Sequence, residues 1–137
     1  MSTKRFVLAT LAGGTAVFML GGLLYGVLTV SFFEANQGSA VGVMRETPDY
    51  VHLFLGQLVF GALLTVVIGT WAGQSGAGAG LRLGAVFGAL FGFAIDLTMF
   101  GLTNISNITA TLVDPFFAMI QMGIGGAVVG GVLAKVR

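Results

Sequence analysis

The fold of this chain is decided by residues 80–102, which read GLRLGAVFGALFGFAIDLTMFGL. A glycine stands at every fourth position in the first part of this stretch, at Gly80, Gly84, Gly88 and Gly92. The next position on the same row is Asp96. Because residues four apart share one face of an α-helix, the stretch predicts a helix with one smooth side that ends in a carboxyl group.

The glycine row favours a membrane helix over a helix in water. An interior glycine costs about 1 kcal/mol relative to alanine in a water-exposed helix. In a bilayer the backbone must satisfy its own hydrogen bonds, so the helix forms regardless, and a row of glycines lets a neighbouring helix approach closely. We therefore predict glycine-zipper packing here. Asp96 is the one acid deep in an apolar segment, and such acids usually face the bundle interior and serve a function.

The composition leaves no surface for a soluble domain. The chain has 137 residues, of which 56% are hydrophobic and 8% are charged, against about 25% charged in soluble domains. Four apolar segments have membrane-spanning length, at about 6–30, 50–71, 81–102 and 115–136. These predict an all-α fold: one compact Gly-rich four-helix transmembrane domain over residues 1–137. With a net charge of +1 and no cysteine, we expect no nucleic-acid partner and no thiolate metal site.

The distribution of basic residues predicts the orientation. Four spans place five of the cations on one side of the membrane, namely Lys4, Arg5, Arg82, Lys135 and Arg137. Only Arg45 falls on the other side, so the positive-inside rule places both termini in the cytoplasm. The first apolar run, of about 25 residues, exceeds the 7–15 of a signal-peptide core, and we expect it to be a retained span.

Each predicted span carries one polar side chain near its outer end. These four residues are Tyr25, Gln57, Asp96 and Gln121. At 1.5 Å per residue, they all lie within roughly 10 Å of the outer boundary. We hypothesise that they converge on one ligand- or ion-binding site, which opens outward beneath His52 and the 31–49 segment.

Structural interpretations of these residues stay open. Asp96 could hydrogen-bond one of the glutamines and lock the bundle, because polar contacts between spans contribute about 0.6 kcal/mol on average. Tyr25 could be an interface aromatic, and His52 a helix-start histidine. The pairs Pro48-Asp49 and Asp114-Pro115 are typical of helix starts, for spans 2 and 4. Zinc needs three or four protein ligands, and we expect neither a metal nor a cofactor.

Further small residues on spans 2 and 4 indicate helix packing. They are Gly61 and Gly69 on span 2, and Gly126 and Gly130 on span 4. The Gly-rich linker at residues 73–80 predicts that spans 2 and 3 are antiparallel neighbours. The pair Gly22 and Gly26 could form the contact between two copies in a dimer. Besides membrane lipids, we therefore expect a partner, as a homo-oligomer or as a subunit of a membrane complex.

One stretch also resembles known sequences. Residues 92–98 and 101–104 are similar to the Asp-Leu-Thr-Asn neighbourhood of small, uncharacterised bacterial four-span inner-membrane protein families. The resemblance implies a four-span protein of a bacterial inner (plasma) membrane. Those families bring no assigned activity.

Two functions follow from the sequence. The first is binding or transport of a solute or ion at an outward-facing polar site around Asp96, with proton coupling as one form of it. The alternative is a non-catalytic subunit or assembly (scaffold) partner of a larger membrane complex. We predict no enzymatic activity, although an enzyme acting on lipid at the outer interface is a third interpretation.

Overall fold

The computed structural model describes residues 1–136; Arg137, one of the predicted cytoplasmic cations, lies outside the described residues. The elements are α1 (Thr3–Leu23), the π-helix η1 (Leu24–Leu28), α2 (Val30–Ala35), α3 (Tyr50–Thr65), the π-helix η2 (Val66–Trp71), α4 (Ala77–Leu102) and α5 (Ile108–Lys135). Across the described chain, four helices are long and apolar enough to cross a membrane: α1 with η1, α3 with η2, α4 and α5. The predicted all-α four-span fold is confirmed, and the chain is a small polytopic membrane protein in contact with lipid.

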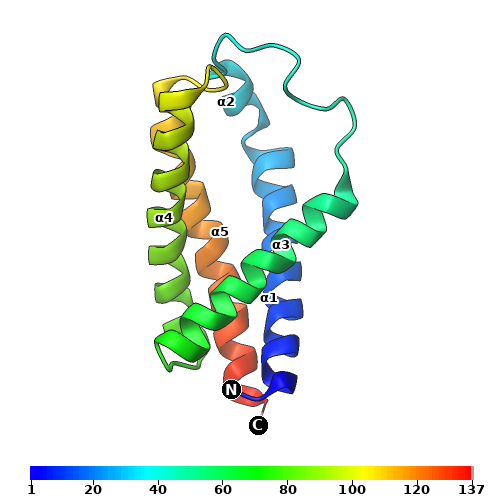
Figure 1. Ribbon diagram of the computed structural model, residues 1–137, viewed down its shortest axis with the longest axis vertical. Coiled ribbons are helices and arrows are strands. Elements are labelled where there is room, and N and C mark those ends of the chain that lie inside the picture. Colours follow the sequence, from blue (N-terminus) through cyan, green and yellow to red (C-terminus); the bar gives the residue numbers. More distant parts are fainter. Residues whose placement is uncertain (137) are drawn as a thin grey trace.

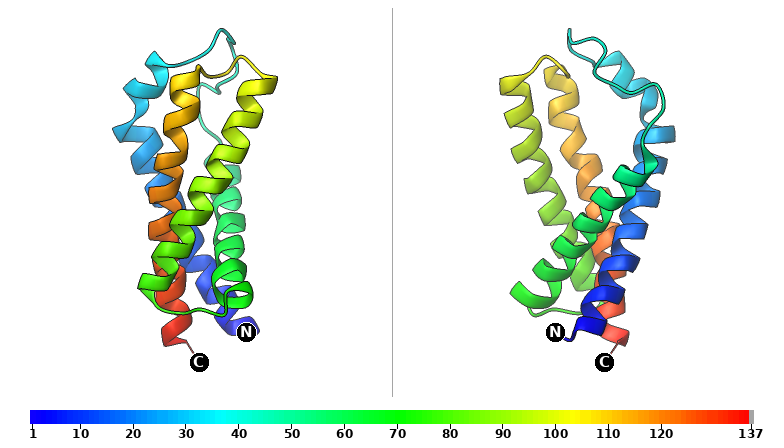
Figure 2. Two further views of the ribbon diagram at one scale, coloured as in Figure 1. Left: turned by 90° about the vertical axis from the view of Figure 1, so that its left-hand side faces the viewer. Right: turned by 45° about the vertical axis from the view of Figure 1, so that its right-hand side comes forward.

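The four long helices form one bundle with two unlike ends (Figure 1). The end that carries the N-terminus, the end of α5 and the 72–76 linker is called the terminal end. The opposite, distal end carries α2, the 36–49 segment and the 103–107 loop. α3 crosses the bundle obliquely, so that it meets α4 near the terminal end and diverges from it toward the distal end (Figures 1 and 2).

The most extensive helix contact joins α4 to α5. Three glycines of the α4 row are buried in it, namely Gly80, Gly84 and Gly88. A Cβ atom at Gly84 would overlap the carbonyl oxygen of Met122, and one at Gly92 would lie 3.0 Å from Cα of Pro115. The two backbones therefore touch, which only a residue without a side chain permits.

The second close contact joins α3 to α1. A Cβ atom at Gly61 would overlap the backbone around Gly14. Beyond the end of α3, Gly69 of η2 packs against α5, where a Cβ atom would lie 2.9 Å from Cδ1 of Leu133. The apolar core fills the space between these helices and α5; its buried members are Ala9, Val17, Leu64, Ile68, Met122, Val129 and Leu133.

The predicted pairing of spans 2 and 3 is therefore corrected. α4 packs chiefly on α5, and α3 packs chiefly on α1. α4 contacts η2, and the Phe60 ring of α3 packs edge-on against the Phe91 ring of α4, with centroids 5.5 Å apart. The short linker holds the end of η2 near the start of α4. Glycine rows nevertheless pack α3 more closely on α1, and α4 more closely on α5.

The starts of α3 and α5 differ in how well the sequence predicted them. α3 begins at Tyr50, as expected, and Asp49 caps it by accepting a hydrogen bond from the His52 backbone N–H at 3.2 Å. α5 begins at Ile108, because the Asn107 side chain caps it by accepting from the Ala110 N–H at 2.9 Å. The prediction that Asp114 stands at a helix start is therefore wrong.

Candidate functional site

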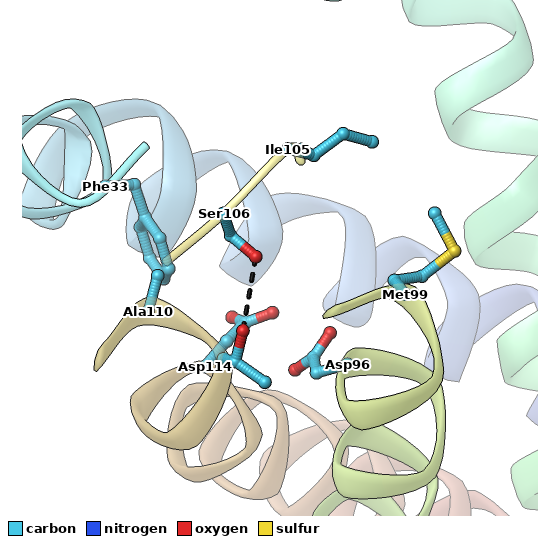
Figure 3. Close-up of a pocket in the computed structure, with 8 residues that line it drawn as sticks. Phe33, Asp96, Met99, Ile105, Ser106, Ala110 and Asp114 are labelled. Atoms are coloured by element: carbon cyan, nitrogen blue, oxygen red, sulfur yellow. Dashed lines mark hydrogen bonds between the residues drawn. The ribbon is translucent and has the colours of Figure 1, made fainter. Parts of the chain in front are cut away.

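Two acidic side chains from neighbouring helices meet at the distal end. Asp96 comes from α4 and Asp114 from α5, and Figure 3 shows their carboxyl groups facing each other. Both line a pocket of about 240 Å³. One oxygen of each, Oδ2 of Asp96 and Oδ1 of Asp114, is buried without a hydrogen-bond partner among the described residues.

The surroundings of this acid pair carry no compensating positive charge. Within residues 1–136, neither pocket at the distal end is lined by a Lys, Arg or His side chain. Two like charges on facing carboxyl groups would repel each other strongly in a protein interior. The pair therefore suits a proton or a cation held between the two carboxyl groups.

Tyr25 completes the cluster from the first span. Tyr25 and Asp114 both line the larger of two pockets at the distal end. The Tyr25 ring packs against Phe33 and Phe117, with centroid distances of 5.7 Å and 6.5 Å. These rings form a wall beside the acid pair.

The local backbone explains why Tyr25 lies there. Tyr25 belongs to η1, a π-helical turn closed by a hydrogen bond from the Thr29 N–H to the Leu24 carbonyl at 2.9 Å. The Thr29 hydroxyl donates to the same carbonyl at 2.6 Å. A π turn takes in one residue more than an α turn, and such turns are frequent at functional sites. The chain then bends into α2, which brings Phe33 over the site.

A second, larger pocket adjoins the first. Its volume is about 550 Å³. The two pockets share five lining residues, namely Phe33, Ile105, Ser106, Ala110 and Asp114. The remaining wall comes from Tyr25 and from the segment at residues 36–44. Asp114 therefore borders both pockets, whereas Asp96 borders only the smaller one among the described residues.

Residues 36–40, here called the distal strap, pair with the 103–107 loop and border the larger pocket. Gly38 and Ala40 donate backbone hydrogen bonds to the carbonyl groups of Ile105 and Asn104, each at 2.9 Å. The Asn107 side chain donates to the Asn36 side chain at 3.0 Å. Below the strap, the Ser106 and Thr111 hydroxyl groups are 3.2 Å apart (dashed line in Figure 3). The strap thus fixes the 103–107 loop above the acid pair.

The two glutamines lie outside this cluster. Gln121 is buried, and its Nε2 donates to the Val17 carbonyl at 2.8 Å, so it joins α5 to α1. Gln57 lies where α3 crosses α1, and its buried Oε1 has no partner in the described part of the chain. Neither side chain lines either of the described pockets. Tyr25 and Asp96 line two adjoining pockets that share Asp114, whereas Gln121 faces α1 and α3 diverges from α4.

His52 also stands apart from the acid pair. It is exposed, and its Nδ1 lies 2.7 Å from Oδ2 of Asp49. The hydrogen bond from the His52 backbone N–H, followed by the contact with its ring, holds the pKa of Asp49 below its ordinary value. Within residues 1–136, no group of three or more His, Asp or Glu side chains is placed to hold a metal ion.

The sequence reasoning missed Asp114, the partner of Asp96. Asp114-Pro115 reads as a helix start, but membrane helices tolerate an interior proline. Asn107 carries the better signal, because asparagine is a preferred N-cap residue and apolar positions follow it. Counted from Asn107, Asp114 falls in the second helical turn, at the depth of the site.

Comparisons with protein-family models, with curated proteins and with solved structures gave no match. The family suggested by the resemblance of residues 92–104 therefore stays a prediction, and the function is argued from the site itself.

Proposed function

We propose that this membrane protein binds a proton or a cation between Asp96 and Asp114, and acts as a small transporter or solute-binding protein. The single observation that carries the proposal is a facing pair of carboxyl groups, each with a buried oxygen lacking a partner among the described residues. An uncompensated charge inside a membrane is costly, so ionisable residues there usually mark ion or proton pathways. Tyr25 lines the adjoining pocket together with Asp114.

The charges at the two ends support a site that faces outward. Lys4, Arg5, Arg82 and Lys135 all belong to the terminal end, and Arg45 belongs to the distal segment. The positive-inside rule then places the terminal end in the cytoplasm. On this proposal the protein lies in a bacterial inner membrane, with the acid pair near its outer surface.

The packing supports a binding site or a carrier more than an open channel. Every residue lining the two described pockets belongs to the distal half, whereas the terminal half is filled by the core and by backbone contacts. Transport would therefore need a change in helix packing. A cation that enters from the outside would displace the proton of the acid pair, which provides a route to proton coupling. The proposal includes no catalytic reaction.

A double-mutant cycle tests this proposal. Asp96→Asn, Asp114→Asn and the double variant are compared with the unmodified protein by reversible unfolding in mixed micelles. Because the two carboxyl groups face each other, we expect their substitutions to be coupled by at least about 1 kcal/mol. Asp49→Asn, remote from the pair, is the control and should add to either substitution. Additive effects of Asp96→Asn and Asp114→Asn would refute the proposed pair.

A non-catalytic subunit or assembly partner is the second candidate. It is supported by three glycines that border open space, Gly22, Gly26 and Gly56, at each of which an added Cβ would meet no atom within 4 Å. Membrane helices use such small residues for close contact with other helices. Native mass spectrometry of the protein released from its membrane would show a second copy or a foreign subunit, and Gly22→Leu would remove it. A monomer without partners would count against this candidate.

A further inference from the structure

We infer that the ligand of this site is an organic cation with an ammonium-type head and an apolar arm. The inference rests on the proposed function and assigns its substrate class. The head would lie between Asp96 and Asp114, and the arm would extend past Phe33 into the larger pocket. Three features of the two pockets carry it: their aromatic wall, their scarcity of oxygen ligands and their apolar outer lining.

The aromatic wall suits a weakly hydrated cation. Phe33 lines both pockets, and its ring packs against Tyr25 and Phe117, at centroid distances of 5.7 Å and 6.0 Å. Asp114 borders the same two pockets. A cation over an aromatic face gains about 0.5–2 kcal/mol, and quaternary ammonium groups are the ligands most often recognised in this way.

The oxygen ligands are too few for a calcium ion. Calcium takes six to eight oxygen ligands, whereas magnesium usually keeps several of its waters. Of the side chains lining the smaller pocket, two are carboxylates, and the hydroxyl groups of Ser106 and Thr111 are already bonded to each other. The other lining side chains are apolar, namely Phe33, Met99, Ile105 and Ala110.

The outer lining suits an apolar arm. The larger pocket is bordered by Ala40, Val41, Val43 and Met44. This part of the chain is not helical, and Val41 and Met44 are 91% and 78% exposed. An apolar group seated there would cover these side chains. The two pockets of about 240 Å³ and 550 Å³ together match the size range of small-molecule sites.

Calorimetry with defined probes tests the inference. Protein in nanodiscs is titrated with benzyltrimethylammonium, tetramethylammonium and magnesium chloride. We expect benzyltrimethylammonium to bind about tenfold more tightly than tetramethylammonium, because the ring is buried as well. Asp114→Asn should weaken binding by at least about thirtyfold, and Phe33→Leu by about three- to tenfold.

A matched control comes from the same pair of helices. Phe93 packs edge-on against Phe116, with centroids 5.9 Å apart, and lines neither of the described pockets. Phe93→Leu removes a ring of the same kind, and we expect it to leave the affinity for benzyltrimethylammonium unchanged. Equal losses in Phe93→Leu and Phe33→Leu would show a structural effect and overturn the aromatic contact.

The remaining outcomes separate this inference from the proposed function. If the two acids are coupled in the double-mutant cycle but benzyltrimethylammonium does not bind, the organic ligand is overturned and the proton or cation site stands. If magnesium binds and both ammonium probes fail, the inference is also overturned, in favour of an inorganic ion. If the substitutions of the two acids are additive, both proposals fall.

Discussion

The terminal and distal halves of this bundle are built by opposite means. In the terminal half, glycines bring helix backbones into contact, and the apolar core leaves little space. In the distal half, α3 diverges from α4, two pockets open, and two buried carboxyl oxygens lack partners among the described residues. The tightly packed terminal half therefore acts as a scaffold, which holds costly polar groups in place at the other end.

The α4 row shows where one half gives way to the other. From Gly80 to Gly88 an added Cβ would overlap backbone atoms of α5, whereas at Gly92 the nearest backbone atom is 3.0 Å away. The next positions on the row are Asp96 and Phe100. Side chains of this size separate the two helices, so the acid pair lies at the first level where a ligand has room.

The largest expected effect on stability comes from adding a side chain in the terminal half, where the helix backbones touch. Gly84→Ala places a methyl group on the Met122 carbonyl oxygen, and we expect it to lower the free energy of unfolding by about 2–3 kcal/mol through overpacking. Gly78→Ala, on the same helix but facing open space, should change it by less than about 1 kcal/mol. Unfolding of the purified protein in mixed micelles measures both. Equal effects would contradict the backbone contact.

Replacing the acid pair in the distal half should instead raise the free energy of unfolding. The double substitution of Asp96→Asn and Asp114→Asn replaces two facing carboxyl groups, each with a buried oxygen that has no partner in the described chain. We expect the free energy of unfolding to rise by about 1 kcal/mol, while ligand binding is lost. A large destabilisation would mean that the two acids hold the bundle together.

The two glutamines give a smaller, paired test. Gln121→Leu removes a hydrogen bond to the Val17 carbonyl and should cost about 0.6–1 kcal/mol. Gln57→Leu removes an oxygen without a partner in residues 1–136 and should be neutral or stabilising. The free energy of unfolding is measured for both variants. A larger loss in Gln57→Leu than in Gln121→Leu would contradict the described side-chain contacts.

Loosening the distal strap should have a local effect only. Asn36→Ala removes the acceptor of the Asn107 side chain. We expect faster hydrogen exchange at the amides of Gly38 and Ala40, with exchange in α4 and α5 unchanged, because the strap is the least tightly packed cover of the site. Unchanged exchange at both amides would show that backbone pairing alone holds the strap.

The smallest expected effect concerns pH at the start of α3. The contacts with His52 lower the pKa of Asp49 from its ordinary value of 3.8. A carboxyl group with a lowered pKa stabilises the folded state above its ordinary pKa, and this contribution is lost as the pH falls through the lowered value. An NMR titration of the ¹³C-labelled Asp49 carboxyl group should therefore have its midpoint below 3.8. A midpoint at or above that value would contradict the cap.

The sequence predicted the fold better than the site. Hydropathy and length identify the four long helices, and spacing in fours identifies the residues along each contact, because both depend on local pattern. Which helix receives a glycine row is a property of three-dimensional packing, so the pairing of α4 with α5 was missed. Depth along a helix placed Gln121 level with Asp96, but the direction of its side chain toward Val17 depends on α1.

The partner of Asp96 was missed for a different reason. Asp114-Pro115 has the local features of a helix start, and Asn107 has them too. Choosing between them requires knowing that the distal strap pairs with the 103–107 loop and holds Asn107 in place. Tyr25 was placed near the site by its depth, whereas the π turn that carries it has no simple signal in the sequence.

The most direct test of the account is proximity labelling of the acid pair. The chain has no cysteine, so Asp96→Cys and Asp114→Cys can be combined and treated with a short bifunctional thiol reagent. We predict rapid crosslinking within one chain, blocked by a membrane-impermeant thiol reagent added from the distal side, and little crosslinking when Gln57→Cys replaces Asp114→Cys. Absence of the crosslink, or equal crosslinking to position 57, would contradict a paired carboxyl site open at the distal end.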